Sequence, residues 1–297
     1  MKDWTDEDLW KLDAIYAEEG VHLHQRPFRA ARDLLGPQFS IGLDNEEFEK
    51  IVSAYRHLIP EVSSSWPGSG IGLIASVDQV RKVTLAVQFG SPGPAATWEI
   101  AGFQNDKEWW EWCRKDSLVA ASTAYACADM HDFIYGLNAI SGKPSDAKDL
   151  WKMARSNLED TANILPTSFS VESVTQPVCM VAELAMKACL VWHGWDINAL
   201  KGNKGHDLVD LAEKMQESSP HRDDSFVTDI VSKMPPYVAS RYSPQGLTRL
   251  HVVNLALGAQ FIAASTLRRL SDCDMAWEME ENDKEWPFSR VSLFPKS

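Results

Sequence analysis

An acid, a base and a histidine lie close together in the stretch VAELAMKACLVWHGW, residues 181–195. Glu183 and Lys187 are four residues apart, and Lys187 could act as a point charge that holds an anionic group such as a phosphate. The same spacing, with the acid on the N-terminal side, also suits an intrahelical ion pair worth about 0.2–0.5 kcal/mol. The intrahelical ion pair suffices to explain why these two residues are present. Binding of an anionic ligand by Lys187 is the more specific alternative.

His206 is a second candidate for ligand binding. It follows a basic loop that contains Lys201 and Lys204 and precedes a predicted helix. The N-terminal amides of a helix favour anions, so His206 could help to bind one there. A purely local hydrogen bond at the start of the helix is the simpler alternative.

Arg241 and Tyr242 lie before another predicted helix. Arg241 could lock the helices together by pairing with an acid such as Glu183, or it could reach a ligand, and the locking role is preferred. If Lys187, His206 and Arg241 converge in three dimensions, they form a ligand site.

A bundle of helices is expected to position these residues. Apolar residues recur at helical spacing through most of the C-terminal half, and the connections between these segments are short. The pattern predicts an antiparallel bundle. Its five helices are expected near 147–165, from Pro177 to Gly194, from about Leu208 to Met215, near 225–239 and over 247–270.

In the N-terminal half, the sequence pattern predicts helices at 4–19 and 44–58 and a small antiparallel sheet between residues 66 and 103. Thr5 and Asp8 have the spacing of a capping box, and Asp44 can cap the second helix. Three β-branched or aromatic runs are expected to be strands, namely GIGLIASV (70–77), KVTLAVQF (82–89) and ATWEIAG (96–102).

These patterns predict an α+β protein that is predominantly helical. The break SGKPSD at 141–146 is the expected domain boundary. It divides an α+β domain at 1–140 from a helical bundle at 147–271. An acidic and aromatic tail follows at 272–297, which could be a linker with a strand that docks on the sheet, or a segment that grips a partner subunit.

Composition narrows the possible functions. The net charge of −13 argues against a protein that coats nucleic acid, although residues 151–271 hold 12 basic and 12 acidic side chains and could present a local basic patch. The five cysteines are scattered and show no CxxC spacing, which predicts neither a metal site nor disulfides. No signal peptide or membrane span is indicated, so we expect a cytoplasmic protein. We also expect no cofactor.

The order of features from 147 to 271 resembles the HEPN family of prokaryotic helical-bundle domains. The resemblance is carried by Ala-Glu-x-Ala-x-Lys-Ala at 182–188, His-Asp-Leu at 206–208 and Arg-Tyr at 241–242. It does not extend to residues 1–140. It implies a bundle that commonly pairs with a second copy, and a role in toxin–antitoxin, antiphage or RNA-processing systems.

Many members of that family are metal-independent ribonucleases with an Arg-x(4–6)-His motif, and this chain contains no such motif. The resemblance therefore predicts a non-catalytic or degenerate HEPN-type protein that binds a nucleotide, an RNA or a partner protein, as a homodimer or in a hetero-complex. One alternative is a ribonuclease with a rearranged site of His206, Arg241 and His251. Another is a regulatory companion of a nucleotidyltransferase or other effector.

Overall fold

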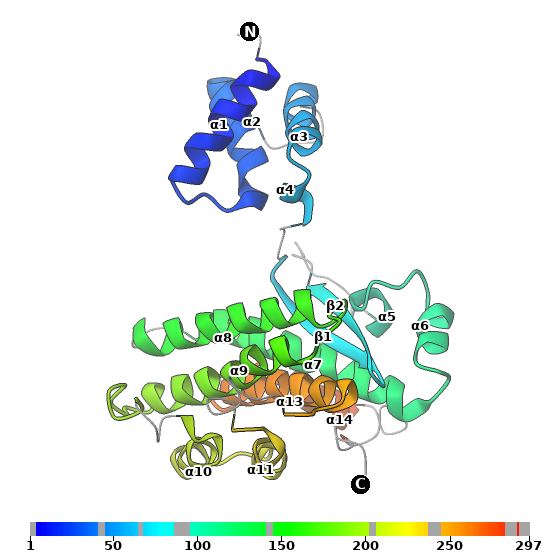
Figure 1. Ribbon diagram of the computed structural model, residues 1–297, viewed down its shortest axis with the longest axis vertical. Coiled ribbons are helices and arrows are strands. Elements are labelled where there is room, and N and C mark those ends of the chain that lie inside the picture. Colours follow the sequence, from blue (N-terminus) through cyan, green and yellow to red (C-terminus); the bar gives the residue numbers. More distant parts are fainter. Residues whose placement is uncertain are drawn as a thin grey trace. The chain divides into compact units, whose positions relative to one another are not determined.

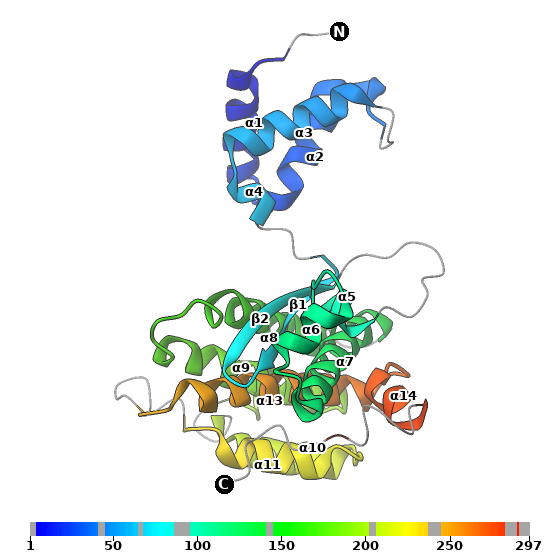
Figure 2. The ribbon, with the colours of Figure 1, turned by 90° about the vertical axis from the view of Figure 1, so that its right-hand side faces the viewer.

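The computed structural model describes residues 4–40, 45–64, 68–85, 96–140, 145–201, 206–236, 245–282 and 290. The chain divides into two compact units, 1–67 and 68–297 (Figures 1 and 2). Most described residues are helical, and the described parts contain one two-stranded antiparallel sheet. The predicted α+β, mainly helical fold class is therefore confirmed.

The division falls at residues 67 and 68, whereas the sequence predicted it at 141–146. The predicted boundary lies between two helices, α7 (Ser117–Ala139) and α8 (Ser145–Ile164), which both belong to the second unit. The reason is packing, because the sheet and α7 share one hydrophobic core with the bundle helices. A polar break in the sequence marks a loop and does not by itself mark a domain boundary.

The first unit is helical, and its core is built on aromatic and aliphatic side chains such as Tyr16, Phe48 and Tyr55. The predicted capping box is confirmed, since Thr5 and Asp8 cap the first helix reciprocally. The cap of the third helix is Asn45, and the predicted Asp44 lies outside the described residues. The helices are α1 (Asp6–Glu18), α2 (Arg26–Leu35), α3 (Glu46–Leu58) and α4 (Glu61–Ser64).

The second unit begins with the sheet, in which β1 (Gly70–Ser76) pairs with β2 (Gln79–Leu85). Every residue of β1 is buried. The two strands meet at a tight turn in which Val77 has a φ of 60°. The third predicted strand, 96–102, is wrong, because the helical turn α5 (Thr97–Ile100) lies there. Glu99 stabilises that turn by accepting a hydrogen bond from the backbone N–H of Ala96 at 3.0 Å.

A glutamine side chain pairs with the backbone of β1. The N–H of Leu73 donates to Gln260 Oε1 at 2.8 Å, and Gln260 Nε2 donates to the Leu73 carbonyl at 3.1 Å. Gln260 lies on a helix that runs past the sheet. Its side-chain amide makes the two backbone hydrogen bonds that a neighbouring strand would otherwise make. Gly72 permits this approach, since a Cβ there would lie 2.7 Å from Gln260 Oε1.

Long helices cover the sheet and form the bundle (Figure 1). The central helix α9 (Glu172–Trp192) packs against α8 and α13 (Arg249–Arg268), and α13 packs against α7. The fully buried Trp151 of α8 donates a hydrogen bond to Thr266 of α13 at 3.0 Å, which joins two of these helices in the core. The remaining helices are α6 (Asp106–Trp112), α10 (Leu208–Ser218), α11 (Asp224–Lys233) and α14 (Met275–Asn282).

The predicted bundle helices are present, with corrected ends. Helix α9 starts at Glu172, before the predicted start at Pro177, because the buried Val174 and Thr175 extend its packed face. Helix α11 ends at Lys233 and not near 239. By length and composition α9 and α13 could cross a membrane, but 83% and 89% of their apolar windows are buried within the protein, as in the core of a soluble protein.

The first part of the tail is neither a linker nor a strand. Residues 275–282 form α14, whose Ala276 is fully buried in a small cluster with Tyr125 and Ala128 of α7. Met275 and Met279 pack against the same cluster. Apolar residues at helical spacing therefore outweigh the acidic side chains that suggested a linker.

Candidate functional site

One carboxylate of the central helix connects two of the predicted site residues. Glu183 Oε1 accepts a hydrogen bond from Lys187 Nζ at 2.7 Å, and Glu183 Oε2 lies 3.0 Å from His206 Nδ1. The intrahelical pair that the sequence predicted is therefore present. The same carboxylate also contacts His206, which lies 23 residues further along the chain. This contact is not the local hydrogen bond that was the simpler prediction for His206.

Two helices position this cluster. Helix α9 places Glu183 and Lys187 one turn apart on the same face, and α9 packs against α10. His206 precedes the N-cap of α10, where Asp207 accepts hydrogen bonds from the backbone of Val209 and Asp210 at 3.1 and 3.2 Å. These two amides therefore already have a carboxylate partner from the chain itself.

Exposure increases steadily across the cluster. The side chains of Glu183 and Lys187 are 6% and 11% exposed, whereas that of His206 is 38% exposed. The carboxylate and the ammonium group are therefore held inside the unit. The imidazole is the member of the cluster that solvent or a ligand can reach.

This arrangement suits a histidine that binds an anion or moves a proton. A carboxylate at Nδ1 fixes the orientation of the ring and favours the tautomer with its proton on that nitrogen. In that tautomer Nε2 carries the lone pair that can accept a proton.

The remaining predicted residues are not joined to this cluster by the described structure. Arg241 and Tyr242 lie outside the described residues, as does Lys204. His251 is exposed in the first turn of α13, where its Nδ1 lies 2.8 Å from the Thr248 hydroxyl. Of the three residues expected to converge, Lys187 and His206 do so through Glu183.

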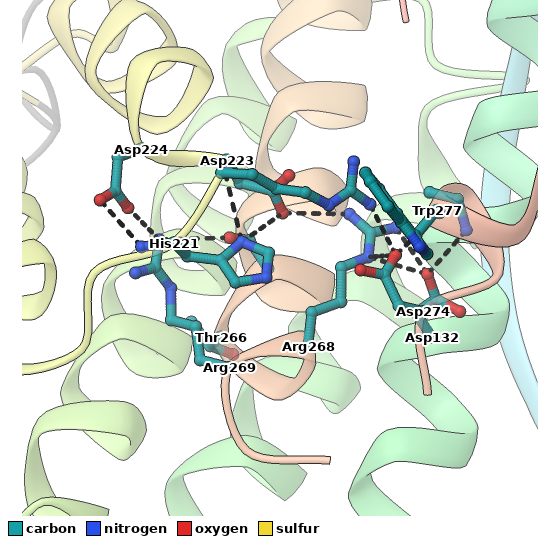
Figure 3. Close-up of polar contacts among 12 residues, drawn as sticks. Asp132, His221, Asp223, Asp224, Thr266, Arg268, Arg269, Asp274 and Trp277 are labelled. Carbon is teal, nitrogen blue, oxygen red and sulfur yellow. Dashed lines mark hydrogen bonds and ion pairs between the residues drawn. The ribbon is translucent and has the colours of Figure 1, made fainter. Parts of the chain in front are cut away.

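A second polar cluster, which sequence reasoning missed, surrounds Arg268 near the end of α13. Its Nη2 donates to Asp129 Oδ1 at 2.6 Å and its Nε donates to Asp132 Oδ2 at 2.8 Å. Its Nη1 donates to Asp223 at 3.3 Å, and Asp274 lies 3.3 Å from Nε. Figure 3 shows the guanidinium between Asp223 on one side and Asp132 with Asp274 on the other.

The buried charges of this cluster stabilise one another. Burial disfavours the charged form of Arg268, but the carboxylates of Asp129, Asp132 and Asp223 raise its pKa above the ordinary value. Burial likewise opposes ionisation of Asp132 and Asp223. Hydrogen bonds from His131 and His221 and the charge of Arg268 outweigh this effect and lower the pKa of each carboxyl. These groups therefore remain charged inside the protein.

A signal for this cluster is present in the sequence but is weak. Asp129 and Asp132 interrupt the otherwise apolar run ACADMHDFIYG, and a spacing of three places them on one face of a helix. Arg268 ends the apolar run of α13. Each residue taken alone is typical of a solvated surface, and the pairing across more than a hundred residues has no local pattern.

Metal ligands do not gather in the described parts of the chain, where no group of three or more His, Cys, Asp or Glu side chains is placed to hold an ion. Four of the five cysteines are small core residues. Cys113, Cys127, Cys179 and Cys189 are buried, and Cys273 is partly exposed.

A hollow of about 290 Å³ lies in the first unit, beside α2. The two arginines that line it already have acidic partners, since Arg29 pairs with Glu19 at 2.5 Å and Arg32 with Asp33 at 3.1 Å. The cluster of Glu183, Lys187 and His206 is therefore the stronger candidate site. No family model, no curated protein and no solved structure matches the chain.

Proposed function

We propose that the second unit contains a HEPN-type bundle that binds an RNA or a nucleotide at the cluster of Glu183, Lys187 and His206, without cleaving it. One observation supports this most. Two of the segments that carry the resemblance, 182–188 and 206–208, meet through a single carboxylate. The proposed setting is a bacterial defence or toxin–antitoxin-like system in the cytoplasm, with the chain acting as a homodimer or in a complex with another protein.

The ammonium group of Lys187 and the imidazole of His206 are both suited to donating hydrogen bonds to a phosphate. Glu183 holds Lys187 and His206 on its two oxygens, so both side chains are ordered before a ligand arrives. Preorganised donors bind with less loss of conformational entropy than free side chains do. The half-exposed imidazole makes the first contact in this proposal, and Lys187 strengthens the local positive potential behind it.

The pairing of Glu183 with His206 also favours a second candidate, a metal-independent ribonuclease with a rearranged site. A histidine oriented by a carboxylate can take the proton of a ribose 2′-OH. A guanidinium would then stabilise the charge of the phosphorane, and Arg241 is the residue that the sequence offers for that role. The missing Arg-x(4–6)-His motif places this candidate second.

An RNA assay distinguishes these candidates. The purified chain is incubated in EDTA with end-labelled tRNA and with total RNA, and binding and cleavage are followed by filter retention and denaturing gels. We expect retention of intact RNA by the parent and an affinity about tenfold lower or worse for His206→Ala, equivalent to about 1.4 kcal/mol. His57→Ala is the matched control, because this histidine is exposed in the last turn of α3 in the first unit and belongs to neither candidate site, and it should bind as the parent does.

Two results would contradict the proposal. Cleavage by the parent that disappears in His206→Ala would establish the ribonuclease instead. Equal RNA retention by the parent and both variants, or none by any of them, would remove RNA as the ligand of this cluster.

A further inference from the structure

Arg290 is described within the tail, and its guanidinium is buried in the second unit. Nη1 donates to Asp129 Oδ2 at 3.0 Å and Nη2 donates to Asp129 Oδ1 at 2.8 Å. These two parallel bonds form the forked contact that a guanidinium makes with a carboxylate and that an ammonium group cannot make. The side chain is 3% exposed, so the contact is desolvated.

Two aromatic rings complete the surroundings of this guanidinium. Its Cζ lies 4.7 Å from the ring centroid of Tyr125 on α7 and 4.7 Å from that of Phe261 on α13. A cation over a ring face is attracted by the ring quadrupole, and the attraction grows when water is excluded. The carboxylate of Asp129 and the two rings therefore form a pocket that matches a planar cation. We call Asp129, Tyr125 and Phe261 the guanidinium pocket.

Arg268 balances only part of the negative charge of the buried cluster. Asp129, Asp132 and Asp223 contribute three buried negative charges, and Arg268 donates to all three. Arg290 supplies the second positive charge and takes both oxygens of Asp129. Without it, Asp129 would keep only the bond from Arg268 Nη2 in a water-poor environment, which is a costly arrangement.

We propose that the guanidinium pocket is a binding site for an arginine side chain, that Arg290 of the same chain occupies it, and that a small guanidinium compound can enter when this side chain is removed. The pocket fastens the Arg290 side chain to α7 and α13. Its ligand class is the alkylguanidinium ion, selected by the forked carboxylate contact and the two flanking rings.

Chemical rescue tests this site in the full-length chain. Arg290→Ala should lower the melting temperature by about 10 °C, because a buried ion pair loses one partner. Ethylguanidinium at millimolar concentration should restore much of that loss. Ethylammonium, which has the same charge but no fork, should restore little. A loss in Arg290→Ala that neither compound reverses, or that both reverse equally, would overturn the proposal.

Arg222→Ala is the matched control. Arg222 also pairs with two carboxylates, those of Asp274 and Glu280, and lies 4.9 Å from the ring of Trp277, but its side chain is 29% exposed. Its removal should change the melting temperature by no more than a few degrees, and ethylguanidinium should not raise it. Rescue of Arg222→Ala to the same extent as Arg290→Ala would show a general salt effect and overturn the site.

Arg290→Lys provides a test if the alanine variant does not fold. It keeps the positive charge and loses the fork, so a melting temperature below that of the parent is expected, whereas an unchanged value would overturn the proposal. Size-exclusion chromatography tests whether the occupant belongs to the same chain. The parent and Arg290→Lys should elute alike, and a dimer that dissociates only in the variant would place Arg290 in the pocket of a second copy.

Discussion

The two polar clusters of the second unit use similar groups in opposite ways. In the cluster of Glu183, Lys187 and His206, one carboxylate contacts an ammonium group and an imidazole, and the imidazole reaches the surface. In the cluster around Arg268, carboxylates surround a guanidinium whose side chain has no exposed surface. The first cluster keeps one member accessible to a ligand, whereas the second buries its guanidinium together with Asp129, Asp132 and Asp223.

This difference assigns the two clusters different roles. Removing charges from water costs free energy that only a complete set of partners recovers, so the loss of one member of a buried network is strongly destabilising. Removing an exposed member such as His206 costs less, because water replaces the missing partner. We therefore expect stability to depend mainly on the Arg268 cluster and binding to depend on the Glu183 cluster.

The largest expected effect is that of Arg268→Met. It removes the cation that three buried aspartates share, and we expect the free energy of unfolding to fall by about 3–5 kcal/mol or more. Chemical denaturation followed by circular dichroism measures the loss. Arg222→Met, at a partly exposed ion pair, should cost about 1 kcal/mol or less. If both variants unfold at the same denaturant concentration, the buried cluster has no special role.

The pH dependence of stability should follow the same cluster. The pKa values of Asp132 and Asp223 are lower in the folded protein than their ordinary value of 3.8. Stability from these groups is therefore fully present above that value and is lost as the pH falls through the lower, folded-state pKa values. Between pH 7 and 5 these two groups should therefore leave the melting temperature almost unchanged. Below about pH 4 we expect the melting temperature to fall steeply. A melting temperature that stays constant down to pH 2 would contradict this.

A smaller loss of stability is expected for Glu183→Gln, which leaves the buried Lys187 without its charged partner. We expect about 1–3 kcal/mol, the cost of an unsatisfied buried polar group. Glu159→Gln is the matched control, because Glu159 forms an ion pair of the same i,i+4 spacing with Arg155 on a more exposed face. It should cost about 0.5 kcal/mol or less. Equal losses in urea denaturation would mean that the Glu183 pair is an ordinary surface pair.

The smallest effect concerns the thiol one helical turn before Glu183. Burial, together with the carboxylate of Glu183, raises the pKa of Cys179 to about 12. The thiolate is the reactive form, so Cys179 should not react with a disulfide reagent at pH 8 while the protein is folded. The partly exposed Cys273 should react first. Mass spectrometry after timed labelling checks this order, and early modification of Cys179 would show that this part of α9 opens to solvent.

Local patterns in the sequence predicted much of the fold. The capping box of Thr5 and Asp8, the strand at 70–76 and the helix at 249–268 follow from spacing within a few residues. Predictions failed where a local pattern was ambiguous or where distant contacts decided the structure. The run at 96–102 has strand-like residues, but Glu99 caps a helical turn there. The domain boundary depends on how the sheet packs, which composition does not encode.

The candidate site was partly predictable for the same reason. The spacing of Glu183 and Lys187 predicted their pair, because four residues span one helical turn. The contact of Glu183 with His206 depends on how α9 packs against α10, and no local pattern specifies it. The forked contact of Arg290 with Asp129 joins residues 161 positions apart, and neither residue differs in type from a solvated charge.

The separation of binding from stability is tested most directly by measuring the RNA affinity and the melting temperature of two variants, His206→Gln and Asp132→Asn. We predict that His206→Gln weakens RNA binding about tenfold or more with a nearly unchanged melting temperature. Asp132→Asn should lower the melting temperature and keep the parental affinity at temperatures where it is folded. Parental affinity in His206→Gln, or lost affinity in folded Asp132→Asn, would contradict the assignment of binding to the Glu183 cluster.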